Sequence, residues 1–177
     1  AESAAWEGVD GGINALWASS DRVYSRSVVP QNLSESCSVT AWRAERVSAQ
    51  ILIWASEDLQ GVECSISDFE SDSATLPSDI AQARFVGYVL GDKPDKSCLC
   101  GRPNGHTDIL QADLLHDVHA ANIAAKTTRP LWITLNIPQD AQAGTYRATV
   151  KISHRGWGSV KLPLEVNVVN QTLAEPS

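Results

Sequence analysis

The chain has 177 residues, with 14 basic and 21 acidic side chains and a formal net charge of −7. That length suits a single domain with one core. No cluster of lysine and arginine is available to bind a nucleic acid, and no apolar run approaches the roughly 20 residues that a membrane-spanning helix needs, so neither partner is expected.

The two ends are set apart from this core. Residues 1–18 are expected to form an extended N-terminal arm, and residues 170–177 a linker. The chain begins with Ala1 and contains no methionine, which indicates a processed or excised segment whose signal peptide, if it had one, has been removed.

Four short strands are predicted in the first half of the chain. The stretch "SCSVTAW" (36–42) alternates apolar and polar residues, as a half-buried strand does. The stretch "SAQILIWAS" (48–56) is apolar on both faces and is expected to lie centrally in its sheet. Two further runs, "GVECSIS" (61–67) and "ARFVGYVLG" (83–91), complete this set.

The middle of the chain has a different pattern. Residues 91–108 are rich in glycine, proline and aspartate and are predicted to form a long loop, which in a compact domain is often functional. In residues 107–119, apolar residues recur at every fourth position behind Thr107, a candidate N-cap. This spacing predicts one short helix.

Three strands are predicted in the last third. In "PLWITLNIP" (130–138), Ile133 and its alternate neighbours share an apolar face, and Trp132 lies on the opposite face. The stretches 145–153 and 160–168 alternate in the same way, and "HRGWG" (154–158) between them is typical of a hairpin tip. Pro163 inside the last strand predicts an edge position or a bulge.

Seven such segments with turn residues between them favour an all-β fold. We therefore predict a single antiparallel β-sandwich over residues 1–177, immunoglobulin-like or jelly-roll-like, with at most one short helix. A domain of this size buries enough surface to be stable without a disulfide or a metal. No cofactor and no metal are expected.

The four cysteines, Cys37, Cys64, Cys98 and Cys100, form no C-x-x-C pair. Cys37 and Cys64 lie in predicted strands, where a free cysteine is commonly a small core residue. A Cys37–Cys64 disulfide is also possible, and the sequence does not decide between the two states.

Signatures of catalysis are missing from the sequence. There is no G-x-S-x-G elbow, no phosphate-binding glycine loop and no H-E-x-x-H. No pair of acidic residues has an apolar setting that would separate their pKa values, as acid–base hydrolysis requires. The chain alone is not expected to be an enzyme.

One cluster of potential metal ligands falls within residues 98–119. Its C-x-C spacing is tighter than the usual C-x₂₋₄-C of zinc sites, and its last two histidines are separated by only two residues. We interpret the segment as a polar loop followed by a solvated helix face, with metal binding as the less favoured alternative. The residues are Cys98, Cys100, His106, Asp108, Asp113, His116 and His119.

The chain has six tryptophans but only two phenylalanines. Trp42, Trp54 and Trp132 lie in strands and are expected to pack against the sandwich. Trp157, at the hairpin tip, either folds back over the end of the sandwich or makes an external contact. The candidate carbohydrate or interdomain contacts are therefore Trp157, Arg155 and Arg102.

Several stretches, in their order, resemble the N-terminal β-sandwich domain that precedes the catalytic barrel in glycoside hydrolase family 123. The resemblance covers nearly the whole chain, with two departures. Ala44 stands where relatives commonly have glycine, and Cys98 adds a second cysteine to the usual "CG". The stretches are "SSDRVY" (19–24), "AWRAERVSAQILIWAS" (41–56), "CGRPNG" (100–105), "PLWITLNIPQDAQAGTYRATVKI" (130–152) and "VNVVNQTLAEPS" (166–177).

This resemblance implies a function by way of a partner. Family members hydrolyse terminal β-linked N-acetylgalactosamine by substrate-assisted catalysis, using an adjacent Asp–Glu pair in a (β/α)₈ barrel. No residue of this chain matches that pair, so no catalytic residue is carried over. The resemblance implies instead a non-catalytic accessory domain, whose linker 170–177 leads to a downstream catalytic domain of the same polypeptide.

The resemblance further implies an extracellular, periplasmic or cell-surface location in a bacterium. Two alternatives to the accessory role stay open. The first is an autonomous carbohydrate-binding module that holds a glycan on Trp157. The second is a metal-binding domain that uses the cluster within residues 98–119.

Overall fold

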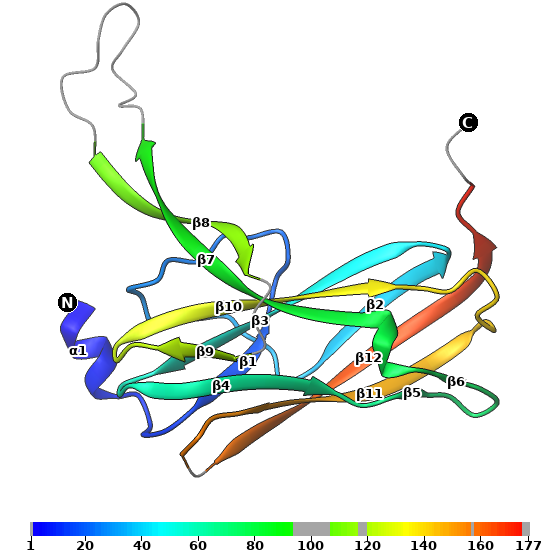
Figure 1. Ribbon diagram of the computed structural model, residues 1–177, viewed down its shortest axis with the longest axis horizontal. Helices are drawn as coiled ribbons and strands as arrows, with labels where there is room; N and C mark the ends of the chain where they lie inside the picture. Colours follow the sequence, from blue (N-terminus) through cyan, green and yellow to red (C-terminus); the bar gives the residue numbers. More distant parts are fainter. Residues whose placement is uncertain (1, 94–106, 117–119, 157, 175–177) are drawn as a thin grey trace, which may run out of the picture.

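The computed structural model describes residues 2–93, 107–116, 120–156 and 158–174, and these form two packed sheets (Figure 1). The described part of sheet A has five strands in the order β1-β3-β10-β7-β8. Their bounds are Asn14–Ala18 (β1), Arg46–Ala55 (β3), Thr127–Asn136 (β10), Ala81–Lys93 (β7) and Thr107–His116 (β8).

Sheet B has the order β2-β12-β11-β4-β9, and the short strand β5 pairs with β11 on one side and with β6 on the other. A short helix, α1, precedes the sandwich, and a 3₁₀ turn, η1, precedes β7. The bounds are Glu2–Glu7 (α1), Cys37–Arg43 (β2), Leu59–Ile66 (β4), Phe69–Glu70 (β5), Thr75–Leu76 (β6), Ser78–Ile80 (η1), Ala120–Ile123 (β9), Gly144–Ser153 (β11) and Ser159–Thr172 (β12).

The predicted β-sandwich is confirmed, because alternate residues of both sheets meet in one core. Leu131, Ile133 and Leu135 of β10 are fully buried, and they face fully buried residues of sheet B such as Tyr146 and Val150. The period of two therefore directs one face of each strand inward, as the sequence indicates. All seven predicted strands form, with boundaries shifted by a few residues.

The predicted central strand is β3, which lies between β1 and β10. Ile51 and Ile53 point into the core, while Leu52 is fully buried on the opposite side of the same strand. A sheet in a simple sandwich would leave that outer face in water. Something therefore covers the outer face of sheet A at this point.

The helix predicted at residues 107–119 is wrong, because residues 107–116 form strand β8. This strand pairs antiparallel with β7 from Phe85 to Lys93, with an irregularity at Asp113. The predicted loop at 91–108 is also wrong at its two ends, which belong to β7 and β8; residues 94–106 lie outside the described ones. Pairing with the long strand β7 outweighs the helical spacing of apolar residues, because the segment that carries this spacing is too short to fix a helix.

Both chain ends contribute to the sandwich. Residues 1–18, expected as an extended arm, contain α1 and the edge strand β1, and Trp6 and Trp17 are buried there. At the other end, β12 continues to Thr172, inside the predicted linker 170–177. The first and last described elements thus belong to the same compact unit.

One strand pair departs from the predicted antiparallel arrangement. β2 runs parallel to β12, starting from the pair Cys37 and Leu164. β12 is therefore an interior strand, although Pro163 was expected at an edge or a bulge. Because the pairing with β2 begins one residue after Pro163, this proline lies where that side of β12 has no neighbouring strand.

β7 divides its length between two partners. It pairs with β10 only from Ala81 to Phe85, and then continues with β8 as a two-stranded ribbon that leaves the sandwich (Figure 1). The edge of β10 before Leu131 is consequently free of β7. A segment from another part of the chain takes that place.

Candidate functional site

Residues 19–30, here called the strap, cover the outer face of sheet A next to the departing ribbon. The backbone N–H of Thr128 donates to Arg26 O at 2.8 Å, and its hydroxyl donates to Val28 O at 2.9 Å. Tyr88 Oη lies 3.3 Å from Tyr24 O and 3.2 Å from Thr128 O. The strap thus gives Thr128 hydrogen-bond partners at the part of β10 that β7 does not reach.

Gln50 holds the other end of the strap. This side chain is only 4% exposed, and its amide Nε2 donates to Ser19 O at 2.7 Å and to Arg22 O at 3.2 Å. Both amide protons are therefore used, and the carbonyl oxygen is the group left to accept a further hydrogen bond. A buried polar residue in a central strand is explained by this anchoring role.

Burial also affects Tyr88, the residue that joins the ribbon to the strap. It raises the pKa of Tyr88 to about 12, although the nearby cations Arg129 and Arg26 act in the opposite direction. The phenol therefore keeps its proton at physiological pH and can donate it to a strap or β10 carbonyl.

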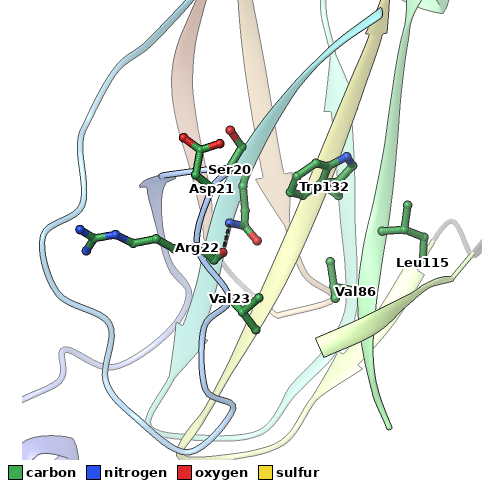
Figure 2. A pocket seen from close by; sticks show the side chains of 8 residues that line it. Ser20, Asp21, Arg22, Val23, Val86, Leu115 and Trp132 are labelled. Carbon is green, nitrogen blue, oxygen red and sulfur yellow. Dashed lines mark hydrogen bonds between the residues drawn. The ribbon is translucent and has the colours of Figure 1, made fainter. Parts of the chain in front are cut away.

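A pocket of about 320 Å³ opens between the strap and the place where the β7–β8 ribbon leaves β10 (Figure 2). The side chains of Val23, Val86 and Leu115 gather around it, beside the ring of Trp132. Val23 is 71% exposed and Leu115 is 39% exposed, so the rim is apolar and accessible. We call this site the strap pocket; Ser20, Asp21, Arg22 and Gln50 complete its lining.

The tryptophans differ from expectation at one position. Trp54 and Trp132 are half-buried on the outer face of sheet A, and Trp132 lines the strap pocket. Trp42 was expected to pack against the sandwich, but it is 42% exposed at the end of β2. Its neighbour Ala41 points into the core, so the alternation of the strand turns Trp42 outward.

Of the three predicted contact residues, Arg155 is the one within the described ranges, and it does not line the strap pocket. Trp157 and Arg102 lie outside the described residues, so contacts through them stay predictions. Arg155 is exposed at the hairpin between β11 and β12, where its backbone N–H donates to Gln60 O at 2.9 Å. The sequence did carry one signal for the strap pocket, since the alternation of residues 131–137 placed Trp132 away from the core.

The structure shows the state of two of the four cysteines. Cys37 and Cys64 are free thiols, packed against the core from β2 and β4. Two strands, β12 and β11, separate them in sheet B, which corresponds to roughly 14 Å at about 4.8 Å per strand. That separation is too large for a disulfide. Cys98 and Cys100 lie outside the described residues.

Most of the proposed metal cluster is also outside the described residues, namely Cys98, Cys100, His106 and His119. Within the described ranges, no group of three or more His, Cys, Asp or Glu side chains is arranged to hold a metal ion. Those same ranges contain no helix long and apolar enough to cross a bilayer.

The outer face of sheet B has a different character from that of sheet A. Arg147 Nε lies 3.3 Å from Glu165 Oε2, and Ser38 Oγ donates to Glu165 Oε1 at 3.3 Å. Thr149 and Lys161 beside them are exposed. This face is a polar surface that includes the Arg147–Glu165 ion pair.

Comparison with known proteins identifies the fold and the family. The family model described as "Glycoside hydrolase 123 N-terminal domain" matches residues 17–154. Among solved structures, a family 123 glycoside hydrolase from Clostridium perfringens, studied for glycolipid glycan hydrolysis, matches with a TM-score of 0.76 and 18% identity. The match covers 93% of this chain but only 28% of that one.

Weaker similarities carry no functional argument. AvmM, which catalyses macrocyclization in alchivemycin A biosynthesis, matches 93% of this chain and 94% of that one, with a TM-score of 0.44 and 7% identity. The secreted serine protease VesC from Vibrio cholerae matches 74% of this chain and 21% of that one, with a TM-score of 0.37 and 11% identity. No curated protein matches the chain.

The family match spans well over half of the sequence and agrees with the resemblance predicted from its motifs. The solved family 123 enzyme adds the same sandwich in three dimensions. The chain belongs to the glycoside hydrolase 123 N-terminal domain family.

Proposed function

We propose that this chain is a non-catalytic accessory domain, which supports a downstream (β/α)₈ barrel of the same polypeptide. One observation carries the proposal: the chain matches a family 123 glycoside hydrolase over 93% of its own length but 28% of that chain. In such an enzyme, the sandwich corresponds to one part and the larger remainder is left for the catalytic domain.

The chemistry of the described surface supports this role. The lining of the strap pocket includes a tryptophan and a single carboxylate, that of Asp21, so it lacks the pair of carboxylates that glycoside hydrolysis commonly requires. The catalytic groups are therefore assigned to the downstream barrel. We further propose that the enzyme acts on terminal N-acetylgalactosamine of extracellular glycans, at a periplasmic or cell-surface location in a bacterium.

The test compares the parent enzyme with a version that lacks residues 1–170. We expect the shortened enzyme to inactivate faster on heating, because the barrel loses a surface that the sandwich covers. The readout is the release of N-acetylgalactosamine from a chromogenic glycoside after timed heating. Equal half-lives for the two proteins would argue against a supporting role, and sugar release by the sandwich alone would refute a non-catalytic one.

A further inference from the structure

Building on the proposed function, we propose that the outer face of sheet A is the seat of the downstream catalytic domain. In this arrangement, an apolar side chain of that domain fills the strap pocket.

The exposed apolar side chains single out this part of the molecule. Among the described residues, five large hydrophobic side chains are exposed. Val23 and Leu115 form the rim of the strap pocket, and Leu173 follows the end of β12, whereas Trp42 is turned outward from β2 of sheet B and is not part of this surface. Large apolar groups concentrated on a surface mark a contact with another protein surface, and tryptophan is prominent in such contacts.

The direction of the chain agrees with this location. The end of β12 and the β7–β8 ribbon point to the same side of the sandwich, with β3 and β10 running between them (Figure 1). The backbone N–H of Leu173 donates to Arg43 O at 2.8 Å, which fixes the exit beside the turn between β2 and β3. A domain that follows this exit therefore begins on the side of the sandwich to which the ribbon points (Figure 1).

The exit and the pocket are close enough for one partner to cover both. Arg46, just after the turn, donates from Nε to Asn136 Oδ1 at 2.8 Å. From Asn136 to Trp132 the chain advances four residues along β10, or roughly 13 Å at about 3.3 Å per residue. A standard interface of about 800 Å² per partner extends farther than that.

The pocket itself favours an apolar side chain over a sugar. Val86 and Trp132 form an apolar floor, and the amide protons of Gln50 are already used by the strap. The polar residues Ser20, Asp21 and Arg22 line the strap side of the pocket, whereas Val86 and the ring carbons of Trp132 at its floor give the hydroxyl groups of a sugar no hydrogen-bond partner. The outer face of sheet B instead carries exposed polar residues such as Thr149 and Lys161 beside the Arg147–Glu165 ion pair, and such a face is suited to solvent.

Hydroxyl-radical footprinting of the intact parent enzyme tests the proposal. We expect hydroxyl radicals to label Val23, Leu115 and Trp132 several-fold more slowly in the intact enzyme than in the isolated sandwich. The variant Val23→Glu should restore reactivity at Leu115 and Trp132, because a carboxylate at the rim opposes docking. Val23 is 71% exposed, so this change does not disturb the sandwich itself.

Val28→Glu is the matched control. Val28 is 45% exposed on the same strap, but it lies beside Thr128, four residues farther from the exit along β10 than Trp132. We expect the footprint of this variant to equal that of the natural enzyme. Equal restoration by both variants would overturn the proposal.

The remaining outcomes separate this inference from the proposed function. Protection that appears on the outer face of sheet B, around Arg147 and Lys161, overturns the docking surface but leaves the accessory role intact. Protection on neither face overturns both. Protection of Trp132 only after N-acetylgalactosamine is added makes the pocket a sugar site and overturns the docking proposal.

Discussion

Ala44 occupies the tight turn between β2 and β3 with a φ of 60°, in the left-handed region. Glu45 closes this turn, since its backbone N–H donates to Trp42 O at 3.3 Å and its carboxylate accepts from Trp42 N at 2.7 Å. Residues with a Cβ atom are strained in this region, and glycine is not. A glycine at this position, which the family resemblance implies, would thus relieve a physical strain.

Ala44→Gly is therefore expected to stabilise the fold. Removing the left-handed strain gains about 1–2 kcal/mol, and the greater freedom of glycine in the unfolded chain costs about 0.5–1 kcal/mol. The net gain in the free energy of unfolding should be about 0.5–1 kcal/mol, measured by urea denaturation. Ala81→Gly is the control, because Ala81 has an extended φ of −105° and should lose stability. A destabilised Ala44→Gly variant would contradict the argument.

Cys64 makes the stability depend on alkaline pH. Burial raises the pKa of this thiol from 9.0 to about 12. Between those values the unfolded chain loses the proton while the folded chain keeps it, so stability falls as the pH rises. Tyr88, with its pKa raised by burial from 10.0 to about 12, adds an effect of the same sign.

Cys64→Ala should flatten this dependence. Under reducing conditions, the natural chain should lose at most about 1.4 kcal/mol per pH unit from this thiol above pH 9. The measurement is urea denaturation at several pH values between about 8 and 11. Ser65→Ala, at the exposed neighbouring position, should keep the natural slope. An unchanged slope in Cys64→Ala would show that the thiol is not the titrating group.

At the scale of elements, the strap depends on one amide. Gln50→Glu keeps the shape of the side chain but replaces both donors to Ser19 O and Arg22 O with oxygen. We expect a loss of about 1–3 kcal/mol or more at neutral pH, because a buried carboxylate then faces two carbonyl oxygens. Acidification should recover part of it, since a protonated carboxyl donates one hydrogen bond.

Hydrogen exchange provides the readout for Gln50→Glu. The amide of Thr128, which donates to Arg26 O, should exchange faster in the variant as the strap opens. Thr134→Ser, on the outer face of β10 but outside the strap pocket, serves as the control. Unchanged exchange at Thr128 would show that the rest of the strap holds without Gln50.

The elements that sequence reasoning found are those with a long local rhythm. β10 and β11 alternate over most of their ten residues, and each buries one face. β8 was missed because its identity comes from β7, a non-local partner, and β9 because it has four residues. The strap has no period at all, since its backbone carbonyls accept from Gln50 and Thr128. No local pattern records such contacts.

The candidate site was likewise predictable only where a local sequence pattern exists. Trp132 could be placed on the outer face of its strand from alternation alone. The same face also has exposed apolar residues, a pocket and a partial cover. These features depend on where β7 leaves β10, which is a property of the whole sheet. Sequence reasoning therefore identified the residue but assigned it to packing instead of to a surface.

For the whole molecule, a single core predicts a single unfolding transition. The core cluster includes residues of both sheets, so neither sheet keeps its buried face without the other. Tryptophan fluorescence and far-ultraviolet circular dichroism should give coincident urea curves. Calorimetry should give a heat-capacity change of about 2 kcal/mol/K for a chain of this length. Curves that separate would indicate that part of the molecule, such as the β7–β8 ribbon, unfolds independently.

The parallel pairing of β2 with β12 has a consequence for biosynthesis. Ser38 and Glu165, which it brings together, are 127 positions apart in the chain. On the ribosome, β2 emerges early and waits with an open edge until nearly the whole domain has been translated, several seconds later at about 5–20 residues per second. Nascent chains of this protein should therefore depend on chaperones that shield that edge until β12 arrives.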